Sequence, residues 1–338
     1  MTDEQKKVLE ASGIVDATDV SRYGSGHINE TYKVETASGA RYILQRVNTT
    51  IFDVDLLKTN VVRVTEFLKS KGVKSLEVVG YDNPWRIYKF LEGYTSRDVV
   101  SEPHQAYDVG RAFAKFQNDL ADIPPPRLED IIPKFHDTPN RLKQLDDAAA
   151  KDVKGRLQSV AAEMAFVDSW RKNASRIVDL MASGEIPERV THNDTKINNV
   201  MIDAKGEAVV IDLDTTMPGS ALFDFGDMVR TSTAAAAEDE ADLSKVFAKR
   251  EYFEALAKGY LEGAKFLNEA ERANLVFSGK LATFEVGIRF LADYLAGDVY
   301  FHTKYDDHNL VRARNQFQMV RSLEEQTADF EAIVKGLS

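Results

Sequence analysis

The chain has 338 residues, enough for about two domains or for one two-lobed enzyme. A hydrophobic content of 43% with 29% charged residues is typical of a folded globular protein and not of a disordered one. The net charge of −11 argues against nucleic acid and anionic membranes as main partners, because long-range electrostatics would repel them. The absence of cysteine excludes disulfides, thiol catalysis and thiolate zinc sites.

The first residues, MTDEQKKVLEASG, contain no apolar core of the signal-peptide type. No run approaches the roughly 18 apolar residues that a membrane-spanning helix needs. We therefore expect a cytoplasmic protein without a membrane partner.

The first third of the chain predicts a small sheet with one helix. After a short polar helix, residues 32–48 alternate in the manner of two strands around a turn at 37–39, which predicts a β-hairpin. Residues 53–71 repeat apolar side chains at three and four spacing and stop at Gly72, as a helix with a glycine cap does. The runs SLEVVGY and WRIYKFLE predict two more strands of the same sheet.

From about Gly93 the pattern changes to long amphipathic helices, predicted over residues 103–121, 138–148, 155–183 and 244–264. One hairpin, NVMIDAKGEAVVIDLD, interrupts them and carries two aspartates at its far end. This order of elements predicts an α+β, protein-kinase-like two-lobed fold. Residues 1–91 would form the nucleotide-binding lobe, a small antiparallel sheet plus a helix. Residues 92–338 would form a larger, mainly α-helical lobe that binds the acceptor and catalyses.

The loop THNDTKIN and the hairpin behind it carry the residue types that phosphoryl transfer needs. Such a reaction requires an acceptor for the proton of the attacking hydroxyl and oxygen ligands for Mg²⁺. Asp194 is the candidate catalytic residue, and Asn199 and Asp212 are the candidate metal ligands. His192 would brace the loop by hydrogen bonding. The order of these residues and the length of the hairpin predict that they meet at one site.

The pattern H-x-D-x-x-x-x-N, followed by an apolar strand that ends in Ile-Asp, resembles the aminoglycoside phosphotransferase and choline kinase superfamily. The resemblance implies a kinase that uses ATP and Mg²⁺. It gives supporting roles to Asp214 and to Asp224 of the stretch FDFGD. It also implies a set of nucleotide-binding residues in the N-terminal loop, on the third strand and at the hinge: Gly24, Ser25, Gly26, Gln45, Phe90 and Leu91.

One position departs from the pattern of the superfamily. Members usually carry a lysine or arginine that pairs with the phosphates where RYIL leads to Gln45 here. Arg46 cannot simply take this role, because neighbouring strand residues point to opposite faces. The helix position of the usual acidic partner is near Asn60, also neutral, so we expect amides in place of the ion pair.

Further stretches indicate the acceptor: GHINETY, RYILQ, THNDTK, IDLDTTMPGS, LFDFGD and RFLADYLAGDVYF are similar to the N-acetylhexosamine 1-kinase group of this superfamily. The implied activity is ATP-dependent phosphorylation of the anomeric hydroxyl of GlcNAc or GalNAc to the α-1-phosphate. The implied sugar contacts are Asp194, His27, Arg289 and Tyr300. The expected partner is a small sugar, and the expected state is a monomer.

Other interpretations stay open. The acceptor could be another small alcohol of the aminoglycoside, choline or homoserine type, or the chain could be a nucleotide-binding pseudokinase that only scaffolds. At single positions, His27 could be a loop histidine without a ligand, Tyr300 could belong to the core, and Arg289 could pair with Asp293 one helical turn away.

Overall fold

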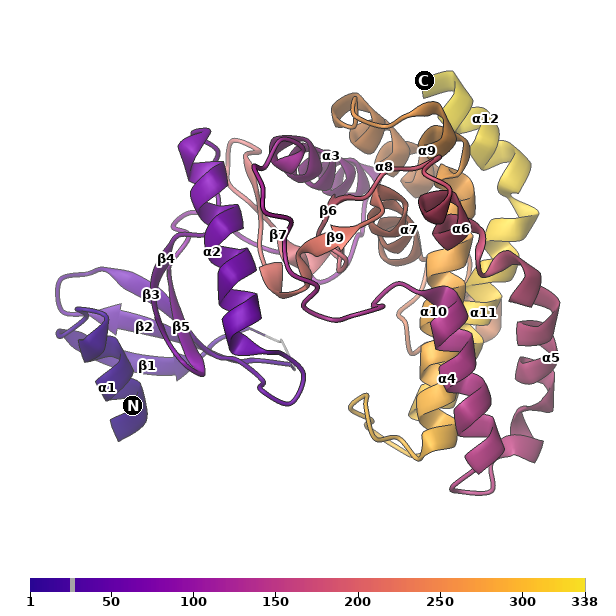
Figure 1. Cartoon of the computed structure of the whole chain (residues 1–338), viewed down its shortest axis with the longest axis horizontal. Coiled ribbons are helices and arrows are strands. Elements are labelled where there is room, and N and C mark those ends of the chain that lie inside the picture. The colour runs from indigo at the N-terminus through magenta and orange to yellow at the C-terminus, as the bar shows by residue number, and fades with distance from the viewer. Residues whose placement is uncertain (25–27, 338) are drawn as a thin grey trace. The chain divides into compact units, whose positions relative to one another are not determined.

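The computed structural model describes residues 1–24 and 28–337 (Figure 1). It confirms the predicted α+β class, with a small antiparallel sheet and a larger helical part. The chain forms two compact units, and each is assembled from three segments. Unit 1 comprises residues 1–96, 122–133 and 201–218, and unit 2 comprises residues 97–121, 134–200 and 219–338. The domain boundary expected between residues 91 and 92 stays a prediction.

Unit 1 is built on a five-stranded antiparallel sheet in the order β1-β2-β3-β5-β4. The predicted hairpin, helix and two further strands are all present, and β1 precedes them. The elements are α1 (Asp3–Ala11), β1 (Ala17–Arg22), β2 (Glu30–Thr36), β3 (Arg41–Arg46), α2 (Val54–Ser70), β4 (Val78–Asp82), β5 (Trp85–Lys89), β8 (Ala208–Val210) and the 3₁₀ turn η4 (Leu213–Thr215). Strand β7 (Val200–Ile202) begins at the boundary between the units, and β9 (Met217–Gly219) ends at it.

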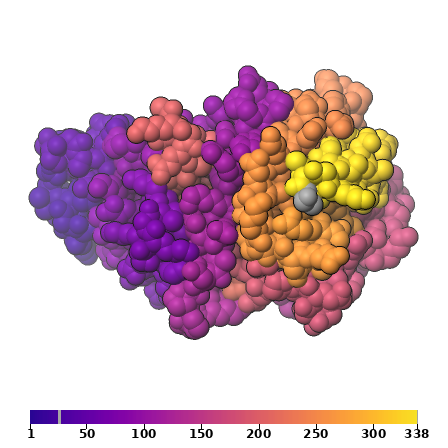
Figure 2. All heavy atoms as spheres, turned by 90° about the horizontal axis from the view of Figure 1, so that it is seen from above, coloured from indigo at the N-terminus to yellow at the C-terminus, as the bar shows by residue number. Residues whose placement is uncertain are grey.

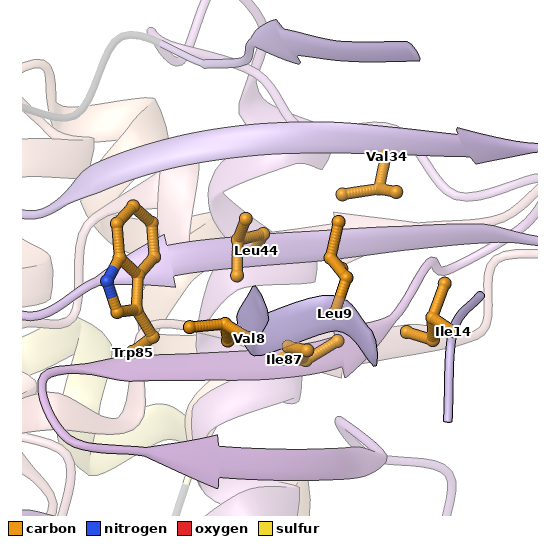
Figure 3. Packing of buried hydrophobic residues seen from close by; sticks show 7 residues of the cluster. All are labelled: Val8, Leu9, Ile14, Val34, Leu44, Trp85 and Ile87. Atoms are coloured by element: carbon orange, nitrogen blue, oxygen red, sulfur yellow. The ribbon is translucent and has the colours of Figure 1, made fainter. Parts of the chain in front are cut away.

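One face of the sheet is apolar and carries the core of unit 1. Leu44 of β3 and Ile87 of β5 lie opposite each other in the register, and both are fully buried. Helix α1 covers them with Val8 and Leu9, as Figure 3 shows. Burial of these side chains stabilises the folded state by roughly 1.5–3 kcal/mol each. This cluster therefore occupies one of the two faces that strand alternation provides.

The opposite face of the same sheet is polar. Thr31, Gln45 and Arg86 occupy matching positions on β2, β3 and β5, so their side chains form one row on this face. Helix α2 packs on this side, where the Nζ atom of Lys58 lies 5.7 Å from the centre of the Tyr81 ring on β4. A buried row of hydrogen-bonding side chains needs partners, which the site below supplies.

Unit 2 is mainly helical, and its helices differ from the predicted ones in two places. The segment expected as one helix over 155–183 is broken around Asn173 and Ser175, two residues that compete with helical backbone bonds. The helix expected from residue 244 begins at Arg250. The elements are α3 (Pro103–Leu120), α4 (Thr138–Lys151), η1 (Leu157–Val160), α5 (Ala161–Trp170), η2 (Arg171–Asn173), α6 (Arg176–Ala182), β6 (Arg189–Thr191), η3 (Ile197–Asn199), α7 (Ala221–Ser232), η5 (Leu243–Lys245), α8 (Arg250–Gly263), α9 (Glu269–Ala273), α10 (Leu275–Ala296), α11 (His308–Glu325) and α12 (Thr327–Leu337).

The core of unit 2 forms around α10, which packs against α4, α7 and α11 (Figure 1). Helix α12, yellow in Figure 2, lies against α8 and α10. Helices α3 and α8 approach each other at Gly110 and Gly259, and each glycine faces backbone atoms of the other helix. Within residues 1–24 and 28–337, no helix combines the length and apolar character needed to cross a membrane.

Candidate active site

The loop that carries Asp194 is held in place by carboxylates of α7. The backbone N–H groups of His192 and Asn193 donate to the two carboxylate oxygens of Asp224 at 2.9 and 2.7 Å. The N–H of Thr195 donates to Asp227 Oδ2 at 2.9 Å. Asn193 adopts the left-handed conformation, with φ 65°. Buried charge-assisted hydrogen bonds of this kind fix a loop conformation that the backbone alone would not hold.

The pKa values of the two buried carboxylates of α7 are shifted in opposite directions. Burial raises the pKa of Asp224, although hydrogen bonds from the loop and from Gln117 Nε2 at 2.7 Å oppose it. Burial would also raise the pKa of Asp227, but the Arg230 guanidinium, 2.8 Å away, outweighs it and lowers that pKa. These contacts support the structural role expected for Asp224. They also add Asp227, which the reading of the sequence did not include.

Asp194 lies at the exposed end of this loop, with 29% of its side chain accessible. Asn199 donates through Nδ2 to the Asp194 backbone oxygen at 2.8 Å and to Asp194 Oδ2 at 3.0 Å. The Nζ atom of Lys196 is 3.1 Å from the same Oδ2. His192 is fully buried between the rings of Phe113 and Phe116, and its Nδ1 accepts from the N–H of Asp194. The carboxylate is thus oriented by neighbours on the same loop.

Lys196 is a candidate functional residue that the sequence interpretation missed. Its side chain is 40% accessible, and its ammonium group lies beside the Asp194 carboxylate, where a negatively charged phosphate would approach in a transfer reaction. The feature of the sequence that could have indicated Lys196 is its position two residues after Asp194 in THNDTK. A lysine beside an aspartate is common on protein surfaces, so position alone did not distinguish it.

Asp212 follows strand β8 in unit 1 and is exposed. It adopts the left-handed conformation with φ 58° and ψ 57°, which is costly for a residue other than glycine. Asp214, two residues later, is buried with 3% exposure. The hairpin end therefore presents one aspartate to solvent and points the next one into unit 1.

The candidate metal ligands fit a magnesium ion by their chemistry. Asn199 uses its Nδ2 to bind Asp194, so the amide oxygen is the atom that it can offer to a cation. Asp212 offers exposed carboxylate oxygens, and Mg²⁺ binds through such hard oxygen ligands. Within the described ranges, no group of three or more His, Asp and Glu side chains is arranged to hold a metal. Any ion would thus need water or substrate oxygens as further ligands.

Asp214 forms a buried ion pair with Arg86 of β5. Arg86 Nη2 donates to Asp214 Oδ2 at 2.9 Å, and Arg86 Nη1 lies 2.5 Å from Asp214 Oδ1. Asn29 Nδ2 donates to the same Oδ2 at 2.6 Å. Burial alone would lower the pKa of Arg86, but Asp214 outweighs it and the pKa of the guanidinium is raised. The sequence did not predict that Arg86 and Asp214 pair with each other.

Gln45 and Asn60, the two amides expected in place of the usual lysine–carboxylate ion pair, bind other partners and not each other. Gln45 accepts from Arg86 Nε at 2.9 Å and donates to Thr31 Oγ1 at 2.9 Å. Asn60 on α2 is fully buried and donates to the backbone oxygens of Glu129 and Thr216 at 2.8 and 3.0 Å. The buried positive charge of this region is therefore on Arg86 of β5, directly opposite Gln45 in the register.

The expected nucleotide residues that the structure describes, Gly24, Gln45, Phe90 and Leu91, belong to unit 1. Ser25, Gly26 and His27 lie outside the described residues. Gly24, next to them, has φ 77°, which favours glycine. At the expected hinge, the N–H of Phe90 donates to the Arg41 backbone oxygen at 3.1 Å. That donor is therefore engaged within the sheet.

Arg289 of α10 lies between aromatic rings in unit 2. Its guanidinium carbon is 5.4 Å from the ring centre of Phe135 and 5.5 Å from that of Phe301. It does not pair with Asp293, whose carboxylate accepts the N–H groups of residues 299–301 at 2.8–3.0 Å and Asn309 Nδ2 at 2.9 Å. Asp293 thereby shapes the turn that carries Tyr300, which is 57% exposed and does not belong to the core.

The same part of unit 2 is connected to the Asp194 loop by a partly buried histidine. His136 Nδ1 is 2.7 Å from Glu285 Oε1, and its Nε2 is 3.3 Å from the Asn193 backbone oxygen. The His136 ring stacks on Phe223 at 4.8 Å. Burial opposes ionisation of Glu285, but His136 and a hydrogen bond from Thr138 outweigh it and lower the pKa of Glu285. His136 thus links Glu285 of α10 to the backbone of Asn193, the residue before Asp194.

Comparison with known proteins places this site in a family. The chain matches the phosphotransferase enzyme family (APH) over residues 19–268. Choline kinase LicA from Streptococcus pneumoniae has the same fold, with 14% identity, a TM-score of 0.61 and coverage of 96% of this chain and 100% of that one. A choline/ethanolamine kinase family protein from Mesorhizobium loti has 17% identity, a TM-score of 0.62 and 99% coverage of both chains. Aminoglycoside phosphotransferase APH(2'')-Ib, bound to ADP, has 12% identity, a TM-score of 0.58 and coverage of 95% and 99%.

The chain shares the protein-kinase-like fold of these choline kinases and aminoglycoside phosphotransferases, and the family match defines its class as a phosphotransferase. The family match spans most of the chain. The chain therefore belongs to the phosphotransferase enzyme family.

Proposed function

We propose that the protein transfers the γ-phosphoryl group of ATP to the anomeric hydroxyl of an N-acetylhexosamine, GlcNAc or GalNAc, and forms the α-1-phosphate. We propose further that it acts in the cytoplasm as a monomer with Mg²⁺. The observation that carries the choice of acceptor is the surroundings of Arg289 in unit 2.

Arg289 suits a neutral, oxygen-rich acceptor. Its guanidinium contacts two aromatic rings and has no hydrogen bond or ion pair with any described residue, so its N–H donors are available to a ligand. Sugars offer hydroxyl and acetamido oxygens to such donors and an apolar ring face to aromatic side chains. Tyr300 is exposed next to Phe301, with ring centres 4.8 Å apart, and supplies a further aromatic surface.

The charges of this region argue against an amine acceptor. Burial and the nearby positive charge of Arg289 lower the pKa of Arg141. The neighbouring carboxylates are already engaged, since Glu285 binds His136 and Thr138 and Asp293 accepts four donors. A choline or aminoglycoside cation would meet the like charges of Arg141 and Arg289 here.

In the proposed reaction, the anomeric oxygen of the sugar attacks the γ-phosphorus of ATP. The bond between that phosphorus and the bridging oxygen to ADP breaks, and the hydroxyl proton passes to Asp194. Asn199 and Lys196 keep the Asp194 carboxylate oriented. Lys196 also offers positive charge to the transferred group. Members of this class rely on positioning and electrostatics more than on covalent chemistry.

Asn199 and Asp212 are the proposed ligands of Mg²⁺, which, when bound, would neutralise phosphate charge. The proposal requires Asp194 and Asp212 to act on the same phosphate. Gly24, Ser25 and Gly26 are the proposed phosphate-loop residues, with Phe90 and Leu91 at the adenine. His27 stays a proposed sugar contact together with Arg289 and Tyr300.

The test is ADP release with Mg²⁺-ATP and a panel of acceptors, followed by phosphorus NMR of the product. We expect turnover of GlcNAc or GalNAc and a product phosphorus that couples to the anomeric proton. Turnover of choline, kanamycin or homoserine without turnover of either sugar would refute the acceptor. Absence of ADP release with every acceptor would favour the pseudokinase interpretation.

A further inference from the structure

Arg86 is the most deeply buried charged side chain of unit 1, with 1% exposure. It is the second residue of β5 and lies on the polar face of the sheet, opposite the apolar cluster of Figure 3. All three guanidinium nitrogens are directed at unit 1 partners, Nε at Gln45 and both Nη atoms at Asp214. That apolar cluster lies on the other face, so its packing does not explain this arginine.

A buried ion pair is a costly way to hold a sheet together. The desolvation of two charges cancels most or all of their attraction, and apolar residues of similar size stabilise a fold at least as well. What the pair provides is geometry, because a guanidinium and a carboxylate meet in a fixed planar arrangement. Asp214 is thus fixed against β5, and Asn29 holds it from a third direction.

Asp212 is the residue whose position this geometry helps to determine. Its left-handed conformation is costly and persists only where the surrounding structure determines it. On the C-terminal side, the chain is held at two points: Asp214 is bound to Arg86, and the Thr216 backbone oxygen accepts from Asn60 of α2 at 3.0 Å. The turn that presents Asp212 therefore follows a segment that is bound to both the sheet and α2.

We infer that Arg86 is a positioning residue for Asp212, and that it replaces the cation that Gln45 no longer provides on β3. This inference rests on the proposed role of Asp212 as a metal ligand. Arg86 acts through Asp214 and not on the phosphate itself, because Asp214 occupies both of its Nη atoms and the side chain is buried. Gln45 steers the guanidinium by accepting from Nε while it donates to Thr31.

The test measures metal binding and does not need an acceptor. Mn²⁺ affinity for the protein with AMP-PNP is followed by electron paramagnetic resonance in wild type and in the double variant Arg86→Met/Asp214→Leu. The double variant leaves no unpaired buried charge, so we expect it to fold, as checked by circular dichroism. We expect its Mn²⁺ affinity to fall by about 10-fold or more, the usual effect of losing a partner that orients a metal ligand.

Two further variants make the result specific. Lys71→Met removes an exposed ion pair of the same unit, with Asp122 at 2.6 Å, and should leave Mn²⁺ affinity unchanged. Arg86→Lys keeps the charge but not the planar contact, and we expect a folded protein whose Mn²⁺ affinity falls between those of wild type and the double variant. It also serves as the test should the double variant not fold.

Mn²⁺ affinity within about twofold of wild type in a folded double variant, or in Arg86→Lys if the double variant does not fold, would overturn the inference. Wild-type protein that binds no Mn²⁺ with AMP-PNP would overturn it as well. Failure of the sugar-kinase proposal looks different, since metal and nucleotide would then bind while neither GlcNAc nor GalNAc is turned over.

Discussion

Arg289 is the residue on which the choice of acceptor depends most directly. Its position between Phe135 and Phe301 leaves its N–H donors directed at neither Asp293 nor Glu285. An arginine that makes ring contacts without an ion pair is well suited to bind a ligand, because no internal partner competes for its donors.

We expect Arg289→Gln to raise the KM for the sugar by about 10-fold or more, because a hydrogen bond to a charged donor contributes roughly 1.5–3 kcal/mol. The KM for ATP should stay unchanged. Steady-state kinetics with each substrate varied in turn measures both values. Arg321→Gln is the matched control, since Arg321 is exposed and also stacks on a phenylalanine, with its guanidinium carbon 4.5 Å from the Phe166 ring centre. An unchanged KM for the sugar in Arg289→Gln would remove Arg289 from the acceptor site.

At the level of residues, the sequence predicted candidates better than it predicted partners. Asp194 and Asn199 were read together from one loop, and the structure joins them by two hydrogen bonds. The Arg86–Asp214 pair was missed because its members are 128 residues apart, and because Arg86 stands in an apolar strand run, WRIYKFLE. The available signal was indirect. Because Gln45 stands where a buried cation is usual, the residue opposite it in the sheet, Arg86, is the natural candidate to carry that charge.

At the level of elements, helices α3 and α8 form the closest helix contact at which glycine is required. A Cβ atom at Gly259 would overlap with the backbone oxygen of Tyr107, and one at Gly110 would overlap with that of Leu256. The two glycines therefore set the distance between the helix axes. Helix α3 also supplies Gln117 to Asp224, so this contact supports the Asp194 loop indirectly.

We expect Gly259→Ala to lower the free energy of unfolding by about 1–3 kcal/mol, because the helices must separate to admit the methyl group. Urea denaturation monitored by circular dichroism measures this loss. Gly336→Ala is the control, because Gly336 is exposed near the end of α12 and nothing lies within 4 Å of its added Cβ. That variant should be neutral or more stable by up to about 1 kcal/mol, the helix preference of alanine over glycine. Equal stability of both variants would show that the α3–α8 contact tolerates a side chain.

The elements that the sequence predicted correctly are those with a strong local signal. The strands around the turn at 37–39 and the helix before Gly72 have clear periodicity and caps, and they were found within a few residues. The three-residue strands β6 and β9 were not predicted, because so short a run has no period. The break near Asn173 was missed because the apolar pattern continues across it.

At the level of the whole molecule, the two units should respond together to nucleotide and metal. We expect AMP-PNP with Mg²⁺ at about 100 times its Kd to stabilise the protein by about 2.7 kcal/mol. For a chain of 338 residues, this corresponds to a rise in Tm of about 4 °C. In Asp212→Asn, the part of this rise that depends on Mg²⁺ should disappear. Differential scanning fluorimetry with and without Mg²⁺ measures it.

Asp19→Asn is the control for this experiment. Asp19 is an exposed aspartate on β1 of the same unit, so its replacement should leave the Mg²⁺-dependent rise in Tm intact. A full Mg²⁺-dependent rise in Asp212→Asn would contradict the assignment of Asp212 as a metal ligand.

Because unit 1 is assembled from three separate segments of the chain, its parts are synthesised at different times during translation. Arg86 leaves the ribosome 128 residues before Asp214. At the usual pace of translation the interval is on the order of 10 s. During that interval the sheet can close its apolar face with α1, while its polar face holds a cation whose counter-charge has not yet been synthesised. Arrival of the 201–218 segment then neutralises that cation and presents Asp212 in the same event, so completion of unit 1 is delayed until residues 97–121 and 134–200 of unit 2 exist.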